Sequence, residues 1–447
     1  MRSLRELAAD LNVSRVKSRT LVDRALTAVN NADGEGARSI LTLYDKQAIA
    51  LADWYDTARR QGNPVPYFAG IPITIKDLFD VAGEVTRAGS RATEGDPPAS
   101  HDAAVVKRLR AAGFIILGKT NMTEFAYSGL GMNAHFGTPV NPYDREAGRI
   151  PGGSSSGAAI SVCEGMAAAS IGTDTGGSCR IPAALCGIVG YKPTAARIPI
   201  EGAFPLSQTL DSIGPLANTV SCCAILDSIM SGGDGADLKP YSIKDLRFGV
   251  PQAYVFDDMD ETVADVFERT LSRLASAGAV IREIPLRVLN ELSAINRKGG
   301  IVGAEAYANH RNRLRSSKAN YDPWVANRIE TGKSQTAADY IDLLADRQMV
   351  ISQVQDECSE LDGMLFPTTP IIAPLISDMQ DDALARMANK LLLRNTAVVN
   401  FLDGCALSLP CHRRAGAPVG LMLVGQTGED RRILSIGKAL EAVLSVQ

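Results

Sequence analysis

Two glycine turns that carry serine lie close together in the sequence, and a lysine ends a hydrophobic run upstream of both. The first turn reads GGSSSG at 152–157, and the second lies within TDTGGSCRIPA at 173–183. Serine is a weak nucleophile and needs a base before it can attack a carbonyl carbon. The chain has only four histidines, none of them in either turn. The candidate base is therefore Lys76, because a lysine held in a closed site can lose its proton.

The glycines of the second turn also indicate an oxyanion hole. An apolar strand runs into glycines at this point, and successive N–H groups at such a turn can point at one spot. The predicted donors are the N–H groups of Thr175, Gly176, Gly177 and Ser178. These residues and Lys76 predict a proton relay for acyl transfer. In this relay neutral Lys76 accepts a proton through Ser154, and Ser154 accepts one from the nucleophile Ser178.

The first turn admits two other interpretations. GSSSG at 153–157 formally matches the G-x-S-x-G elbow of α/β-hydrolases, with Ser155 at its centre, but that elbow needs a preceding strand and a histidine partner. The preceding residues EAGRIPG are typical of a loop, and the histidines that follow have no recognisable context. A phosphate-binding P-loop would need lysine directly after the last glycine, where this chain has Ala158. Both interpretations are disfavoured.

The hydrophobic pattern predicts the elements that position these residues. Residues 1–60 repeat apolar positions at helical spacing and predict an N-terminal helical cover. Short apolar runs then alternate with helical segments, which indicates an α/β fold: a mixed central sheet with helices on both faces. We expect one domain over 1–447. Its catalytic core is expected at 61–235 and 361–447, and a more variable, mainly helical excursion at 240–360.

Composition narrows the classes of function. The net charge is -4 and basic residues are dispersed, which argues against a nucleic-acid partner. No uncharged apolar run reaches the roughly 18 residues that a membrane helix needs, and no signal peptide is recognisable, so we expect a cytoplasmic protein with no membrane partner. The eight cysteines lack the spacing of a disulfide framework or a metal site. We expect free thiols and no metal.

In these motifs the chain resembles the amidase signature family, which uses a Ser-cis-Ser-Lys triad. The resemblance is carried by GIPITIKDLFDVAG, LRAAGFIILGKTNMTEFA, FGTPVNPYD, PGGSSSGAA and IGTDTGGSCRIPAALCGIVGYKPT, and it resumes in LFPTTP and APVGLMLVG. It implies that the base is Lys76, the bridging serine is Ser154 and the nucleophile is Ser178. It also implies a cis peptide bond before Ser154. Asp174 and Arg180 match positions that are expected to pair and hold the turn.

The resemblance further implies hydrolysis of a small amide to acid and ammonia, with no cofactor. The acyl pocket is expected beside EFAYSGLGMN at 124–133, with Ala126, Tyr127 and Ser128 as candidate contacts, and Tyr127 would suit an aromatic or compact acyl group. The segment IPAALCGIVGYKPT and the short length resemble small-molecule amidases of the indoleacetamide hydrolase type. A carbamate or urea-type substrate stays open. So does the glutaminase-type A subunit of a tRNA-dependent amidotransferase. A homodimer is a family-level expectation.

Overall fold

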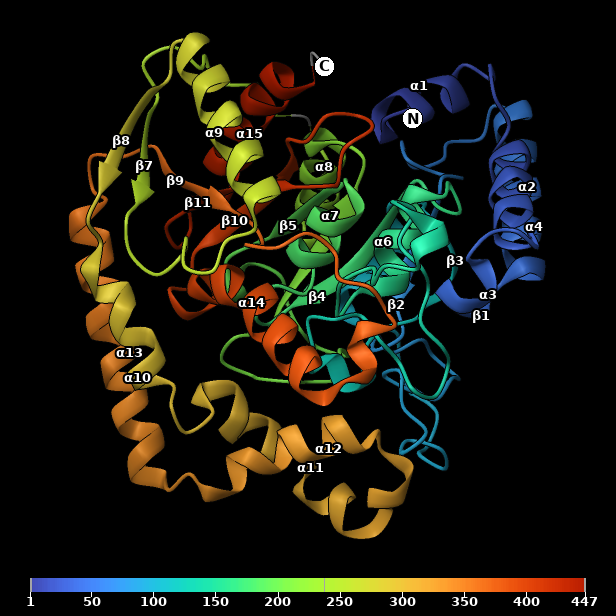
Figure 1. Ribbon diagram of the computed structural model, residues 1–447. Coiled ribbons are helices and arrows are strands. Elements are labelled where there is room, and N and C mark those ends of the chain that lie inside the picture. Colours follow the sequence, from blue (N-terminus) through green and yellow to red (C-terminus); the bar gives the residue numbers. More distant parts are fainter. Residues whose placement is uncertain (1, 237, 446–447) are drawn as a thin grey trace.

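The computed structural model describes residues 2–236 and 238–445 and is built around one large mixed β-sheet (Figure 1). Within these residues the strands pair in the order β1-β3-β2-β4-β6-β5-β10-β11-β9-β7-β8. β2 is parallel to both β3 and β4, whereas the strands from β4 to β9 are joined by antiparallel pairs. The strands are β1 (Ile40–Leu43), β2 (Pro72–Lys76), β3 (Ile115–Thr120), β4 (Ala169–Asp174), β5 (Val189–Lys192), β6 (Ser212–Ala217), β7 (Arg247–Pro251), β8 (Val280–Ile284), β9 (Gly363–Pro367), β10 (Cys405–Pro410) and β11 (Gly420–Gly425).

Both faces of the sheet are covered by helices, as the sequence predicts. Neighbouring residues on a strand point to opposite faces. Leu365 of β9 therefore packs into one hydrophobic core and Phe366 into another. The helices with residues in the first core include α1 (Leu4–Asn12), α5 (Ala104–Ala111), α8 (Val220–Met230), α9 (Glu261–Ser276) and α15 (Asp430–Leu444). The opposite face carries α6 (Ser156–Cys163), α7 (Arg180–Cys186), α13 (Ala337–Glu357) and α14 (Asp382–Phe401).

The N-terminal helical cover contains one strand, β1, that the apolar pattern of residues 1–60 does not predict. Helices α1, α2 (Ser18–Val29), α3 (Gly36–Ser39) and α4 (Asp45–Arg60) form as expected. The residues ILTL at 40–43, however, form β1, which pairs antiparallel with β3 at the edge of the sheet. The expectation of helix throughout 1–60 is wrong here. A four-residue apolar run satisfies helical and strand periodicity equally, and pairing with β3 decides between them.

The predicted excursion divides into two parts. β7 and β8 continue the central sheet, so the segment that leaves it begins only after Ile284. From there helices dominate, and α11 and α12 lie at the bottom of the view in Figure 1, away from the sheet. In this part the α-helices are α10 (Leu292–Ile295), α11 (Gly300–Ser317), α12 (Pro323–Glu330) and α13.

Elsewhere and within this part, the described chain also forms short 3-10 helices. They lie at Glu124–Ala126, Arg145–Ala147, Ala195–Arg197, Arg287–Glu291, Lys318–Asn320, Thr331–Ser334 and Asp378–Gln380.

The helices of the described residues give no membrane-spanning candidate, since none combines the required length with sufficient apolar character. All eight cysteines are free thiols.

Candidate active site

Lys76 lies at the end of β2, a fully buried strand between β3 and β4. Its side chain is completely buried, and Nζ donates hydrogen bonds to Ser154 Oγ at 2.8 Å and to Thr173 Oγ1 at 2.9 Å. Burial lowers the pKa of Lys76 to about 8, while Cys179, Asp174 and Asp211 act in the opposite direction. A substantial fraction of this lysine is therefore neutral near pH 8. When it is neutral, the contact with Ser154 can run with the serine as donor.

Ser154 lies in the glycine turn just before α6 and is also fully buried. The Gly153–Ser154 peptide bond is cis, in agreement with what the resemblance implies. The Ser154 carbonyl accepts the N–H of Thr123 at 3.0 Å. A side chain at 153 would collide with backbone, because a Cβ there would stand 2.6 Å from the Cα and N of Gly131. The turn thus needs glycine at position 153, directly before Ser154.

Ser178 lies in the turn between β4 and α7, and its side chain is nearly buried, with the residue 3% exposed. Its carbonyl accepts the N–H of Ser155 at 3.3 Å, which brings the two serine turns into contact. Across the described parts of the chain, the Ser178 hydroxyl has no hydrogen-bond partner, and none joins it to Ser154 directly. The predicted residues thus meet in one place, with Lys76 bonded to Ser154 and the Ser178 hydroxyl free.

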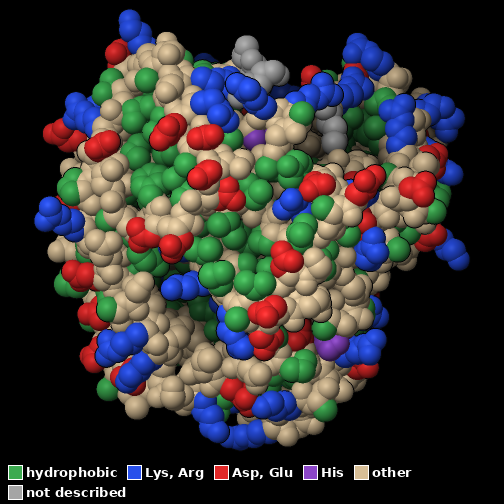
Figure 2. Space-filling model, viewed as in Figure 1, with side chains coloured by type: hydrophobic (Ala, Val, Ile, Leu, Met, Phe, Trp, Pro, Cys, Tyr) green, Lys and Arg blue, Asp and Glu red, His purple; other side chains and the backbone are tan. Residues whose placement is uncertain are grey.

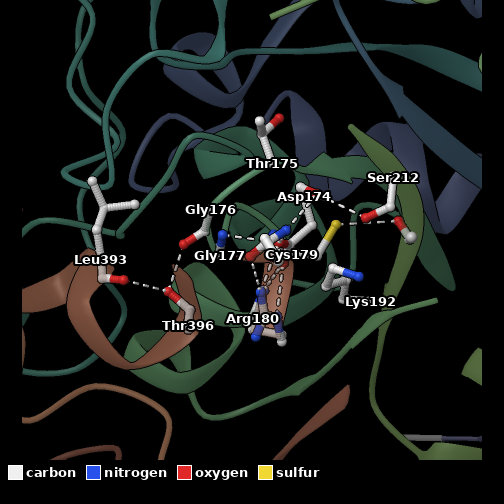
Figure 3. Close-up of polar contacts among 12 residues, drawn as sticks. Asp174, Thr175, Gly176, Gly177, Cys179, Arg180, Lys192, Ser212, Leu393 and Thr396 are labelled. Carbon is white, nitrogen blue, oxygen red and sulfur yellow. Dashed lines mark hydrogen bonds and ion pairs between the residues drawn. The ribbon is translucent and has the colours of Figure 1, made fainter. Parts of the chain in front are cut away.

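A buried ion pair holds the turn that carries Ser178. Asp174 and Arg180 are both fully buried, and Arg180 binds the carboxylate with Nε at 3.0 Å and Nη2 at 2.8 Å (Figure 3). The same carboxylate accepts the N–H groups of Gly177 at 2.8 Å and Cys179 at 3.1 Å, and the Asn400 amide at 3.0 Å. Burial raises the pKa of Asp174, but the Arg180 charge and these donors outweigh it and hold the pKa well below its usual range. The expected pairing is therefore present.

The contacts of this turn reduce the number of N–H groups that could serve as donors in the predicted oxyanion hole. The Gly177 N–H is engaged by Asp174 and is not free for a substrate oxygen. The Gly176 carbonyl accepts a hydrogen bond from Thr396 Oγ1 at 2.6 Å, which fixes this peptide from the side of α14 (Figure 3). The remaining candidate donors are the N–H groups of Thr175, Gly176 and Ser178.

Two further groups near the site have chemistry that could compete with the predicted triad. Cys179 follows the predicted nucleophile Ser178 but is fully buried, and burial raises the pKa of its thiol well above the usual range. Lys192 is also buried, and burial together with Arg180 lowers its pKa to about 8. Its Nζ, however, donates to the carbonyls of Pro193 at 2.8 Å and Gly404 at 2.7 Å. Cys179 is thus poorly suited as a nucleophile, and Lys192 is tied to backbone.

A cavity of about 510 Å³ reaches the turn at Thr175 and Gly176. Figure 2 shows a hollow on the face where Figure 1 places α10 and α14, with basic side chains at its border. Among the described residues that line the cavity are three cations, Arg328, Lys390 and Arg394, and no acidic residue. Its other lining residues are Leu210, Tyr254, Leu292, Ser293, Asn296, Gly299, Gly300, Ile301, Val302, Asn389, Leu393, Ala397, Val398, Asn400 and Phe401.

The predicted pocket residues Ala126, Tyr127 and Ser128 are buried behind this cavity and do not line it. The Arg328 guanidinium lies 4.6 Å from the centre of the Tyr127 ring, and Ser128 Oγ donates to Asn389 Oδ1 at 3.0 Å. Tyr127 and Ser128 therefore support side chains that do line the wall. Their direct contact with a substrate stays a prediction.

The sequence does not predict several residues of the site. Thr173 lies within the quoted motif, and its place on the strand that ends at the turn is a signal that could identify it as a lysine partner. Asn400, Thr396 and Arg328 come from distant helices, and no local signal marks them. Their roles depend on α12 and α14 returning to the sheet.

Comparisons with known proteins show the family to which the chain belongs. The amidase family model matches residues 21–434. A protein named 2-amino-5-chloromuconic acid deaminase from Comamonas testosteroni is 35% identical over 99% of this chain and 96% of its own length. The A subunit of the glutamyl-tRNA(Gln) amidotransferase of Roseiflexus sp. (strain RS-1) is 33% identical over 96% of this chain and 93% of its own length.

Among solved structures, a crystal structure described as an amidase has a TM-score of 0.89 and 31% identity. It covers 99% of this chain and 100% of its own. The match is thus sustained in sequence and in fold over nearly the whole chain. The chain belongs to the amidase family, in its amidase signature group, and is an amide hydrolase.

Proposed function

We propose that the protein hydrolyses a small amide to an acid and ammonia through an acyl-enzyme formed on Ser178. The observation that carries this proposal is the buried Lys76, whose pKa is lowered to about 8 and whose Nζ contacts Ser154 at 2.8 Å. Such a lysine can act as a base at moderate pH, and it lies beside a turn that presents a free serine hydroxyl.

The proposed first half-reaction forms the acyl-enzyme. Ser178 Oγ attacks the carbonyl carbon, its proton moves to Ser154 Oγ, and the Ser154 proton moves to Lys76 Nζ. The oxyanion is stabilised by the N–H groups of Thr175, Gly176 and Ser178. The C–N bond then breaks, and the departing nitrogen takes a proton from Ser154, which is replaced from Lys76.

The second half-reaction removes the acyl group. Water attacks the ester carbonyl, and its proton follows the same path through Ser154 to Lys76. The C–O bond to Ser178 breaks, the serine recovers its proton, and the acid leaves. The proposed cycle uses only this chain's own residues and water.

The cavity wall favours an amide that also bears a carboxylate. Arg328 has no carboxylate partner among the ion pairs of the described residues, and Lys390 is exposed at the same wall. Arg394 is less available, because its guanidinium already donates to the carbonyls of Asp257 and Val255. A guanidinium without a carboxylate partner of its own can bind a planar carboxylate in a bidentate manner.

The name of the Comamonas relative, which specifies an acid as its substrate, supports the same substrate class. The aromatic preference suggested by Tyr127 has less support, since its ring lies behind Arg328.

A second candidate function is that of a glutaminase subunit. Some relatives, such as the Roseiflexus protein, are named as the A subunit of glutamyl-tRNA(Gln) amidotransferase. Under this alternative the chain would release ammonia from glutamine inside a complex and pass it to a partner. Purification of the tagged chain from its own cell extract separates the two. Activity of the isolated chain favours the free amidohydrolase, whereas partner subunits together with inactivity of the isolated chain favour the alternative.

The decisive experiment measures ammonia release by the purified chain alone. The panel contains monoamides of dicarboxylic acids, glutamine, phenylacetamide, indole-3-acetamide, urea derivatives and simple carbamates, each with wild type and with Ser178→Ala. We expect turnover of a carboxylate-bearing amide by wild type only. Equal release by Ser178→Ala would overturn the proposed nucleophile. Turnover confined to neutral arylacetamides would overturn the substrate class and leave the mechanism standing.

A further inference from the structure

The side chain of Thr175 points away from the ion pair that holds the rest of its turn. Figure 3 shows Asp174 facing Arg180 while the Thr175 side chain lies on the other side. Its hydroxyl donates to Asp211 Oδ1 at 2.5 Å. Asp211 directly precedes β6, and its second oxygen accepts the N–H groups of Leu206 at 3.0 Å and Ser207 at 3.1 Å. One carboxylate thus joins the turn to the loop at 206–211.

A second carboxylate holds the same loop from the helical excursion. Glu305 on α11 is only 9% exposed, and it accepts hydrogen bonds from the Ser207 hydroxyl and from the Thr209 hydroxyl. It also accepts the Thr209 N–H at 3.1 Å and the Tyr340 hydroxyl of α13 at 2.6 Å. The loop is therefore held between two carboxylates, one facing the turn and one facing α11 and α13.

Neither carboxylate forms a salt bridge with a cation in the described part of the chain, and all their donors are neutral hydroxyl or amide groups. Burial raises the pKa of Asp211 to about 6, and Glu305 acts in the same direction. Burial of a carboxylate without a cationic partner costs free energy of folding. The hydrogen bond that this buried carboxylate accepts fixes the direction of the Thr175 side chain.

That direction matters because Thr175 and Gly176 line the cavity. An oxyanion donor is effective only when its nitrogen lies about 2.7–3.1 Å from the developing charge. The Gly176 carbonyl is held by Thr396 from one side, and Thr175 is held by Asp211 from the other. Two of the three remaining candidate oxyanion donors, the N–H groups of Thr175 and Gly176, therefore belong to residues that these two hydrogen bonds restrain.

We propose that Asp211 is a positioning residue for the reaction: by holding the Thr175 hydroxyl it aims the N–H groups of Thr175 and Gly176 at the substrate's carbonyl oxygen. Glu305 extends this restraint to α11 and α13, so the helical excursion helps to set the geometry of the turn. The inference rests on the proposed acyl-enzyme mechanism, and it assigns no contact between Asp211 and the substrate.

The test compares Asp211→Asn, Thr175→Val, the double variant and the exposed control Asp265→Asn. We expect each single variant to lower kcat about 10- to 100-fold with KM within about threefold, because alignment in the transition state is what is lost. The double variant is expected to lose no more than Asp211→Asn alone, since both changes break one hydrogen bond. Asp265→Asn should match wild type.

The pH profile separates the loss of the Asp211 charge from the loss of its hydrogen bond to Thr175. Asp211, with Asp174 and Cys179, acts to raise the pKa of Lys76. Asp211→Asn removes that charge and should move the rising limb of kcat/KM to a lower pH than in wild type, where it is expected near the Lys76 pKa of about 8. Thr175→Val leaves the carboxylate in place and should leave the limb unmoved. Should Asp211→Asn fail to fold, the kcat and KM of Thr175→Val decide the question.

A second readout needs no substrate: the rate at which phenylmethylsulfonyl fluoride labels Ser178. We expect this rate to fall in Asp211→Asn and Thr175→Val. Wild-type kcat and labelling rate in both variants, or additive losses in the double variant, would overturn the positioning role alone. Absence of both hydrolysis and labelling in wild type would instead overturn the proposed function, and the inference with it.

Discussion

The turn that carries Ser178 and the wall of the cavity are built in opposite ways. The turn is short, almost wholly buried and fixed by the Asp174 carboxylate, most of whose donors lie within six residues of it. The wall is assembled from α10, α11, α12 and α14, and it includes the partly exposed Arg328 and the exposed Lys390. In the proposed mechanism, therefore, the oxyanion donors and the nucleophile come from one short segment, whereas the proposed substrate selectivity depends on segments far apart in the chain.

Replacement of the nucleophile should have the largest effect. Ser178→Ala is expected to lower kcat by about 10⁴-fold or more, because no covalent intermediate can form. The fold should persist, since the Ser178 hydroxyl is free and only its backbone contacts the neighbouring turn. Ammonia release and thermal melting check both points. The same substitution at the adjacent turn position, Ser155→Ala, is the matched control, and equal loss in both variants would speak against a specific nucleophile.

Removal of the base comes next. Lys76→Ala should lower kcat/KM by about 10²- to 10⁴-fold, the range for a general base. In wild type the neutral lysine is the active form, so kcat/KM should rise with pH, level off above about 8, and fall away below it. The variant should lack that limb, whereas Lys46→Ala on the exposed face of α4 should keep it. An unaltered profile in Lys76→Ala would remove Lys76 from the mechanism.

The bridging serine should matter less than the base. Ser154→Ala is expected to lose about 10- to 100-fold in kcat, near the low end for proton transfer, because a water molecule can occupy the space of the missing hydroxyl. Steady-state kinetics alongside Lys76→Ala checks the ranking. A loss in Ser154→Ala larger than that in Lys76→Ala would mean that the proton does not travel through Ser154 to the lysine.

A change in the cavity wall should have the smallest effect and a different character. Arg328→Gln is expected to raise KM about 10- to 100-fold for a carboxylate-bearing amide, since a charged hydrogen bond is lost, while kcat changes little. Neutral amides should be unaffected. Arg386→Gln, on the exposed surface of α14, is the control. Equal changes in KM for charged and neutral amides would show that Arg328 shapes the wall without binding the carboxylate.

The sequence predicts which residues come together beside the turn for the same reason that the turn is compact. Lys76, Ser154 and Ser178 each lie at or beside the end of an element whose apolar pattern is clear in the sequence, and the structure brings them together. The α/β fold, with helices on both faces of the sheet, is confirmed. The strand β1 escapes prediction because a run of four apolar residues does not settle its own conformation, which depends on β3.

The cavity could not be predicted in this way. Arg328 reaches the site only because α12 returns beside Tyr127, and Asn400 reaches Asp174 from the end of α14. These contacts join residues that no periodicity links, and hydrophobic patterning says nothing of which charged side chain faces inward. For the same reason the pocket residues predicted next to the motif, such as Tyr127, lie one layer behind the wall.

The order of the strands has a consequence for the way the chain is made. β5 pairs on one side with β6, but its other edge is covered by β10, which lies near the C-terminal end of the described chain. On a ribosome, every residue of the proposed triad emerges long before the strand that closes this sheet. Until residues 405–410 arrive, the nascent protein carries an open sheet edge, which is a template for intermolecular pairing. Synthesis of this enzyme therefore includes an interval in which its proposed catalytic residues exist but its sheet is incomplete and exposed to aggregation.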